Sequence, residues 1–364
     1  MQLRWLLALL LLHWLTVDSF ASRESLSAPP EKRRQAGVVD SRGRSHRGGK
    51  RRPKDGLVVI PGLGREDRLV TVRDNLRMLE RLAYIGSGGG RPWDCIVYVY
   101  APHNDTKFWS NQEDIGYISS VCDIVENSNG RITENLHMLQ PSLIKSAYKR
   151  VFILFDDIQL IGKNTLMSSD FDLGGFVEMM SRNGLTVASP RVLDANKGGG
   201  QQFRQIMSEK PREGTSGYIT CWLEMFAWVM TMPAYVALWE VLYPSINPYG
   251  WGHDFWYDNY AREHVRGHRM GIISSYTARH VQGDGRAEAS NTDEIWAAVL
   301  QQEKVYLSRF GVDLKKHRQN MALTNSSLLG AVHGFVYEEK TAALPEESFV
   351  VISGRKWGVK RGNE

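Results

Sequence analysis

The chain has 364 residues, of which 42% are hydrophobic and 23% are charged, and its net charge is +5. This composition excludes a wholly disordered chain and a mini-protein, and it leaves room for one large core or two ordinary domains. The basic charge is local, because residues 31–55 carry +7 whereas residues 56–364 carry −2. Aromatic residues are not interleaved with the basic ones, so no nucleic-acid partner is predicted.

The N-terminus has the features of a targeting segment over residues 1–22. Its apolar run from Trp5 to Leu15 would rise about 16 Å as a helix, well short of the ~30 Å hydrocarbon core of a membrane. We therefore expect a cleaved signal peptide, with a short signal-anchor of the kind Golgi enzymes use as the alternative. The expected location is the secretory pathway, either the Golgi lumen or outside the cell. A membrane is a partner only if the segment is retained as an anchor.

Residues 23–55 predict a disordered basic stem, because they are rich in Gly, Ser, Arg and Pro and lack apolar periodicity. Beyond the stem stand three cysteines, Cys95, Cys122 and Cys221. One disulfide with one free thiol, or three buried thiols, would both fit, and no spacing indicates a zinc or redox site. Acceptor triplets for Asn-linked glycans begin at Asn104 and Asn325, and both are compatible with a lumenal route.

From residue 56 onward, apolar strand-like runs alternate with segments of helical periodicity. Strands are predicted at 57–62, 95–100, 121–125, 151–155, 185–188, 270–280 and 349–352. Helices are predicted at 67–83, 136–148, 173–180, 255–265 and 293–309, with Pro141 beginning a second helical half and Asp170 or Asp172 capping the helix that precedes Gly184. This alternation predicts an α/β fold with a mostly parallel sheet covered by helices on both faces.

Three further segments have weaker signals. Residues 194–217 are rich in glycine and charge and predict a long loop. The apolar, aromatic stretch 218–243 is interrupted by Glu224 and Pro233, so a core helix pair is expected rather than a membrane span. Residues 312–364 are expected to form a C-terminal extension of unclear structure.

Two acids follow a buried strand directly, at Asp156 and Asp157. In parallel sheets, ligands bind at the carboxyl ends of strands. Adjacent carboxylates repel each other unless they share a proton or a cation, and a hard divalent ion that satisfies them could also bind a diphosphate. The alternative is a turn or helix cap in which the aspartates accept backbone hydrogen bonds.

Two later motifs could complete such a site. In the run from Tyr249 to Phe255, the glycines around Trp251 suggest close backbone approach to a ligand, with the indole stacking on a sugar ring or base. Asp254 would then be a candidate general base, or alternatively the cap of the following helix. His280 ends the strand 270–280 and could complete a metal shell, unless it is only a surface or core histidine.

The order of these motifs resembles that of GT-A glycosyltransferases, and more closely that of the family known as domain of unknown function seven-hundred-and-seven. The likeness runs from about Thr133 to Gln282. It is carried by Leu139–Ile144, Val151–Ile158, Phe171–Leu173, Gly184–Pro190, Cys221–Phe226, Gly250–Phe255 and Gly271–His280. It implies a GT-A-like fold over residues 56–311. The implied activity transfers a sugar from a nucleotide-sugar donor to a carbohydrate or glycoconjugate acceptor, with Mn²⁺ or Mg²⁺ as cofactor.

The resemblance also implies roles for single residues. Asp157 and His280 would be metal ligands, Asp254 the catalytic base, Trp251 and Gly252 acceptor-binding residues, and Pro61, Gly62 and Asp156 donor-binding residues. This chain departs from the family at the acidic run, which has two acids followed by Ile158 where the family often has three. Either Asp157 alone binds the metal while Asp156 contacts the ribose, or metal binding is weakened. The alternative function is therefore a non-catalytic carbohydrate-binding or interaction protein on a degenerate transferase fold.

Overall fold

The computed structural model describes residues 52–86, 90–127, 130–163, 170–193, 207–208, 210, 214–250, 252–281, 292–310, 333–335 and 349–350. All of them belong to one compact unit that spans residues 52–364. The predicted targeting segment and nearly all of the predicted stem lie outside the described residues, as does most of the predicted C-terminal extension. Within the described residues, no helix is both long enough and apolar enough to span a bilayer.

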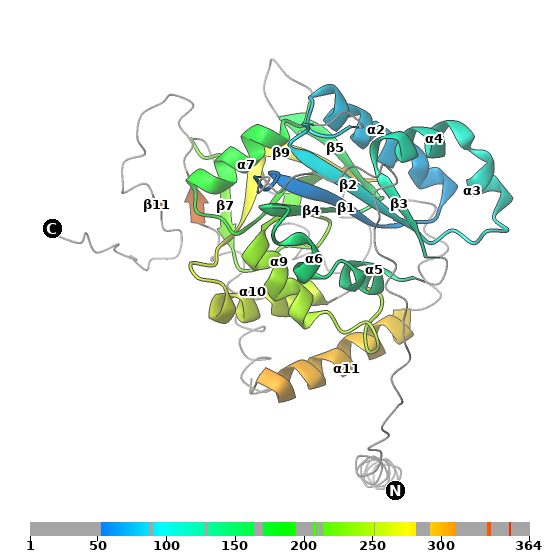
Figure 1. Cartoon of the computed structure of the whole chain (residues 1–364). Helices are drawn as coiled ribbons and strands as arrows, with labels where there is room; N and C mark the ends of the chain where they lie inside the picture. The colour runs from blue at the N-terminus through cyan, green and yellow to red at the C-terminus, as the bar shows by residue number, and fades with distance from the viewer. Residues whose placement is uncertain are drawn as a thin grey trace, which may run out of the picture. The chain divides into compact units, whose positions relative to one another are not determined.

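One sheet forms the centre of this unit, with eleven strands among the described residues (Figure 1). The strands are β1 (Gly56–Leu63), β2 (Trp93–Val99), β3 (Asp123–Glu126), β4 (Arg150–Leu154), β5 (Ile158–Lys163), β6 (Val187–Leu193), β7 (Gly217–Thr220), β8 (Ala227–Thr231), β9 (Met270–His280), β10 (His333–Phe335) and β11 (Phe349–Val350). Their order across the sheet is β11-β10-β7-β9-β6-β8-β4-β1-β2-β3, and β5 pairs with β9 outside this path.

Strand direction confirms the predicted α/β class with a mixed, mostly parallel sheet. Strands β4, β1, β2 and β3 are parallel neighbours, and β6 and β9 are a second parallel pair. Strand β8 lies between β4 and β6 and runs antiparallel to both. The two parallel groups therefore run in the same direction. Of the eleven described strands, only β5, β7, β8 and β11 oppose that direction.

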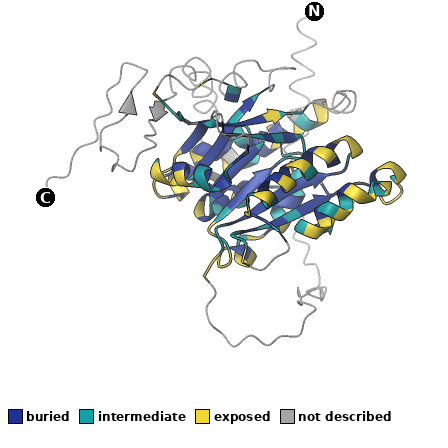
Figure 2. Cartoon of the chain, turned by 90° about the horizontal axis from the view of Figure 1, so that it is seen from above, coloured by how far each residue is buried: buried dark blue, intermediate teal, exposed yellow. Residues whose placement is uncertain are grey.

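Helices cover both faces of the sheet, as predicted (Figure 1). The described helices are α2 (Glu66–Arg81), α3 (Thr106–Ser110), α4 (Gln112–Val121), α5 (Ile132–Met138), α6 (Pro141–Ile144), α7 (Leu173–Arg182), α9 (Met232–Val241), α10 (His253–His264) and α11 (Thr292–Phe310). Helices α2, α4 and α7 lie over one face, and α5, α6, α9 and α10 over the other. Figure 2 shows their buried residues toward the sheet and their exposed residues toward solvent, as expected for amphipathic helices.

The helix pair expected over 218–243 is wrong for its first half. That half forms strands β7 and β8, and only α9 is helical. Strand β8 lies between β4 and β6, and its Trp228 and Val229 are wholly buried, so it is apolar on both faces. A strand buried on both faces lacks the period-two alternation that distinguishes a strand from a buried helix.

Other local predictions are confirmed or refined. Asp172 caps α7, because its carboxylate accepts a hydrogen bond from the Gly175 amide at 3.0 Å. The helix expected over 136–148 is divided into α5 and α6, and Pro141 begins the second one as predicted. Helix α4 was not predicted. The loop expected over 194–217 lies almost entirely outside the described residues.

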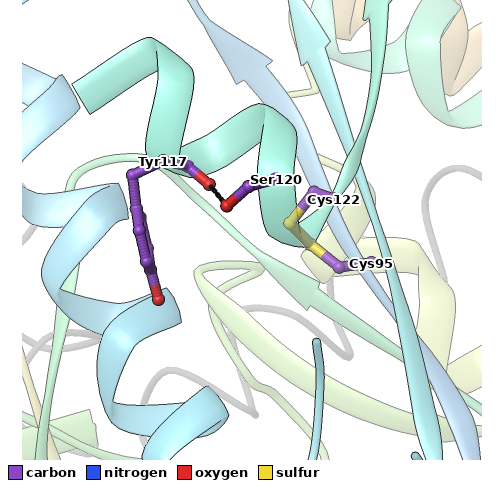
Figure 3. The surroundings of a disulfide bond; sticks show 4 residues. All are labelled: Cys95, Tyr117, Ser120 and Cys122. Atoms are coloured by element: carbon purple, nitrogen blue, oxygen red, sulfur yellow. Dashed lines mark hydrogen bonds between the residues drawn. A yellow bond between two sulfur atoms is a disulfide. The ribbon is translucent and has the colours of Figure 1, made fainter. Parts of the chain in front are cut away.

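The cysteines follow the first of the two alternatives, one disulfide with one free thiol. Cys95 in β2 is bonded to Cys122, which precedes β3, and Cys221 is free (Figure 3). Beside the bond, the Ser120 hydroxyl donates to the Tyr117 carbonyl at 2.7 Å, while the Tyr117 ring points away toward α2. The disulfide therefore ties the end of α4 to β2, the strand next to the edge strand β3.

Candidate functional site

The two adjacent acids lie at the carboxyl end of β4, where the chain turns sharply. The Ile158 amide donates to the Phe155 carbonyl at 3.2 Å, and the chain then continues as β5. Strand β5 pairs antiparallel with β9, so Ile158 lies opposite His280. This register brings Asp157 and His280 together although 123 residues separate them.

Asp157 and His280 form a partly buried pair. The His280 Nε2 atom lies 3.0 Å from Asp157 Oδ2, and the two side chains are 22% and 17% exposed, respectively. The other carboxylate oxygen, Asp157 Oδ1, is buried and has no hydrogen-bond partner among the described residues. A buried carboxylate oxygen without a partner is costly, and a bound cation would satisfy it.

The chemistry of this pair fits a divalent cation, because carboxylate oxygen and imidazole nitrogen both ligate such ions. The two residues do not make a complete cage. Within the part of the chain that the structure describes, no group of three or more His, Cys, Asp or Glu side chains could hold a metal ion. Further ligands would have to come from water or from a bound diphosphate, which is the usual arrangement for Mg²⁺.

Asp156 lies in an environment that disfavours its charge. Burial and, secondarily, the neighbouring Asp157 carboxylate raise the pKa of Asp156 well above its usual range, and Arg68 and Arg65 partly oppose the rise. Arg68 is buried, and its guanidinium donates to the Val281 carbonyl, next to His280. Residues at the start of α2 therefore bring positive charge to the acids. Sequence reasoning missed both arginines, because no periodic signal marks them.

Pro61 and Gly62 belong to the last part of β1, beside β4, and both are buried. The Pro61 carbonyl accepts a hydrogen bond from Asn135 Nδ2 at 2.8 Å. A Cβ atom at Gly62 would lie 3.3 Å from the Tyr100 ring, and one at Gly64 would lie 2.2 Å from it. The tyrosine ring thus lies against the backbone at the end of β1, where only glycine fits at position 64.

Asp254 lies in the first turn of α10, and the cap residue of that helix is Gly252. The alternative in which Asp254 itself caps the helix is therefore wrong. Gly252 has a φ of 85°, and a Cβ there would lie 2.8 Å from Val299, so glycine is required on both counts. The Trp222 indole nitrogen donates to Asp254 Oδ2 at 3.0 Å. Trp251 lies outside the described residues.

His253 anchors the same turn. Its Nε2 lies 3.3 Å from the Thr133 hydroxyl, and its Nδ1 lies 3.1 Å from the Gln302 amide nitrogen. Burial lowers the pKa of His253 to about 4, so the ring is neutral at physiological pH. The helices α5 and α11 therefore fix the position from which Asp254 projects.

One short segment, Cys221–Phe226, links the two parts of the site. At one end, Trp222 contacts Asp254; at the other, the Phe226 ring stacks on His280 with a centroid distance of 5.0 Å. Phe226 also meets Phe155 edge-on at 6.4 Å. Trp222 and Phe226 were not predicted as site residues, although their segment was among those that carried the family resemblance.

A pocket of about 340 Å³ includes none of the predicted site residues, although its Gln159 and Arg279 are paired next to Ile158 and His280. It is lined by residues of α2, β5 and β9, namely Asp74, Asn75, Met78, Arg81, Gln159, Leu160, Ile161 and Arg279. The two acids lie at the carboxyl end of β4, where a bound ligand would have to supply part of the coordination shell of a cation.

No protein-family model and no curated protein matches this chain. Solved structures similar to it include GalNAc-T7, crystallised with UDP, GalNAc and Mn²⁺, at 10% identity and a TM-score of 0.46 over 72% of this chain and 50% of that one. They also include Staphylococcus aureus TarS 1–349, at 11% identity and a TM-score of 0.39 over 73% of this chain and 77% of that one. The longer TarS chain is similar at 10% identity and a TM-score of 0.41, over 72% of this chain and 46% of that one. The chain spans about half the length of GalNAc-T7 and of the longer TarS.

Proposed function

We propose that this chain is a metal-dependent glycosyltransferase of the secretory pathway, acting in the Golgi lumen or after secretion. It would move a sugar from a nucleotide-sugar donor to a hydroxyl of a carbohydrate or glycoconjugate acceptor. The observation that carries the proposal is the Asp157–His280 pair at the carboxyl end of β4, with one buried carboxylate oxygen left without a partner.

On the donor side, Asp157 and His280 would hold Mn²⁺ or Mg²⁺, and the bound cation would supply charge neutralisation for the leaving diphosphate. Asp156 would hydrogen-bond the ribose. Arg65 and Arg68, whose charges act on Asp156, add positive potential where the diphosphate would lie. Pro61 and Gly62, at the end of β1 beside β4, would lie near the nucleotide of the donor.

On the acceptor side, Asp254 would take the proton of the acceptor hydroxyl if the reaction inverts the anomeric centre. The Trp222 N–H holds one carboxylate oxygen of Asp254 and so fixes its orientation. A general base of this kind is worth roughly 10²–10⁴-fold in rate. Trp251 and Gly252 would contact the acceptor, with the Trp251 ring stacking on a sugar face.

A donor screen tests the proposal directly. The purified chain is incubated with a panel of nucleotide-sugars in Mn²⁺ and, separately, in excess chelator, and release of the nucleoside diphosphate is measured. We expect release from at least one donor in Mn²⁺ and its loss in chelator. Release that is unchanged by chelator would contradict the metal assignment, and no release from any donor would contradict the activity.

The second candidate is a carbohydrate-binding or interaction protein without catalysis. It is favoured by the short acidic run and by the lack of any group of three or more metal-ligating side chains in the described part of the chain. Carbohydrate binding on a glycan array, measured beside titration of nucleoside diphosphates with Mn²⁺, separates the two functions. Carbohydrate binding without metal-dependent nucleotide binding would support the second candidate.

A further inference from the structure

The turn between β2 and α3 presents an acceptor triplet for an Asn-linked glycan, Asn104-Asp105-Thr106. Both Asn104 and Thr106 are exposed. The Asp105 amide donates to the Pro102 carbonyl at 2.9 Å, so residues 102–105 form a turn with Asn104 at a central position. Nothing in the proposed transferase site uses this turn.

Neighbouring residues fix the turn without engaging the Asn104 side chain. The Asp105 carboxylate accepts from the Phe108 amide at 3.1 Å and caps α3. The Trp109 indole nitrogen donates to the Pro102 carbonyl at 2.9 Å. Among the described residues, none hydrogen-bonds the Asn104 amide group, so modification there would break no hydrogen bond between them.

The disulfide is independent evidence for the compartment. Cys95 and Cys122 enclose the turn that carries Asn104 in a disulfide-closed loop. Disulfides persist in oxidising compartments such as the lumen of the endoplasmic reticulum and are rare in the cytosol. The same lumenal route is the one on which Asn-linked glycans are added.

We propose that Asn104 carries an Asn-linked glycan. The co-reactant is a lipid-linked diphospho-oligosaccharide. A bond forms between Asn104 Nδ2 and C1 of the first sugar, the bond from C1 to the diphosphate oxygen breaks, the diphosphate leaves with that electron pair, and the amide loses one proton. The proposal stands whether or not the chain is a transferase.

The test uses the full chain, expressed in a secreting eukaryotic cell and extended by a reference acceptor triplet at its C-terminus. The protein is digested with a protease, and its glycans are then removed with a peptide N-glycosidase in heavy-oxygen water, which converts each glycosylated Asn to a labelled Asp. We expect the label at Asn104 in the wild type and in Thr106→Ser, and its loss in Asn104→Gln and Thr106→Ala. Asn325→Gln serves as the control, because it should leave the label at Asn104 unchanged.

Two outcomes would overturn the proposal. In one, the reference triplet is labelled while the Asn104 peptide is not, so the site is passed over in the lumen. In the other, neither is labelled, so the chain does not enter the lumen. Thiol counting on each variant tests whether the Cys95–Cys122 bond has formed, and so separates loss of the acceptor from loss of folding.

Discussion

Two Asp–His pairs in this domain differ in how their charges are compensated. Asp157 and His280 meet at 3.0 Å near the end of β4, and the described residues give Asp157 no ion pair with a lysine or arginine. Asp258 Oδ1 and His268 Nε2 lie 3.3 Å apart between α10 and the start of β9, and neither atom has a hydrogen-bond partner among the described residues. Unlike Asp157, however, Asp258 also forms an ion pair with an arginine, Arg262, at 2.6 Å. The second pair is the more buried, with side chains 7% and 1% exposed.

The surroundings of the two histidines also differ. His268 is fixed on its other nitrogen by the Thr186 hydroxyl at 2.8 Å, so it ties α10 to β6 through polar contacts. His280 instead hydrogen-bonds Asp157 through Nε2, and the Phe226 ring stacks on its face. We call Asp258–His268, which has the Arg262 charge beside it, the compensated pair, and Asp157–His280 the uncompensated pair. We infer that the compensated pair stabilises the fold, whereas the uncompensated pair is arranged for a cation.

The largest expected effect is on chemistry, from Asp157→Asn. This change keeps the shape of the side chain and removes the charge that the proposed cation would need. We expect metal-dependent donor turnover to fall by about 10²–10³-fold, the size typical for loss of one preorganised electrostatic group at a reaction centre. Asp293→Asn, an exposed acid on α11, is the matched control and should leave turnover unchanged. Wild-type turnover in Asp157→Asn would sink the assignment.

The next effect is on stability, from Asp258→Asn. Loss of this carboxylate leaves Arg262 and His268 without their partner, and breaking a buried pair costs roughly 3 kcal/mol. We expect the free energy of unfolding in urea to fall by about that amount, or somewhat less because Arg262 is half-exposed. Metal-dependent turnover should persist below the unfolding transition. Loss of turnover in folded Asp258→Asn, together with loss of stability but not of turnover in Asp157→Asn, would contradict the roles given to the two pairs.

A third effect is pH dependence, from a histidine with no carboxylate partner among the described residues. Burial holds the pKa of His253 at about 4, below its ordinary value of 6.5. The unfolded chain therefore binds a proton that the folded chain excludes, and stability is lost as pH falls through this range. Between pH 7 and pH 5 this residue should contribute a loss of about 2 kcal/mol. His253→Gln should show a correspondingly smaller loss in urea unfolding at the two pH values, and an equal loss would contradict the assignment.

The smallest expected effect comes from Phe226→Leu, which removes the ring that stacks on His280. Aromatic stacking contributes about 0.5–1.5 kcal/mol beyond area burial, so metal-dependent nucleotide binding should weaken several-fold. The control is Trp109→Leu, which removes the stacking on His103 in the disulfide loop. Unchanged nucleotide binding in Phe226→Leu would contradict the role of the Phe226 ring in holding His280.

The uncompensated pair could be predicted in part. The apolar runs at Val151–Leu154 and Met270–Ile273 marked β4 and β9, and residues at the ends of strands in one sheet tend to converge. What the sequence did not show is β5, whose pairing with β9 sets Asp157 beside His280. That strand is a short run after a turn, so its pairing depends on tertiary contacts rather than on local pattern.

The compensated pair could not be predicted. Helix α10 is rich in polar and aromatic residues, and nothing in its pattern shows that Asp258 faces the interior. Asp258 meets His268 only after the chain turns from α10 into β9, and His268 in turn contacts Thr186, which lies 82 residues earlier in the chain. Trp222 could not be predicted for the same reason. Its hydrogen bond to Asp254 spans 32 residues, and Trp222 itself follows strand β7, for which the sequence pattern predicts a helix.

Calorimetric titration of a panel of nucleoside diphosphates in Mn²⁺ into the wild type, Asp157→Asn and Asp258→Asn tests the central claim most directly. Our account predicts metal-dependent binding to the wild type and to folded Asp258→Asn, and none to Asp157→Asn. Equal binding to all three proteins, or binding lost only in Asp258→Asn, would contradict the claim that the uncompensated pair is the metal site.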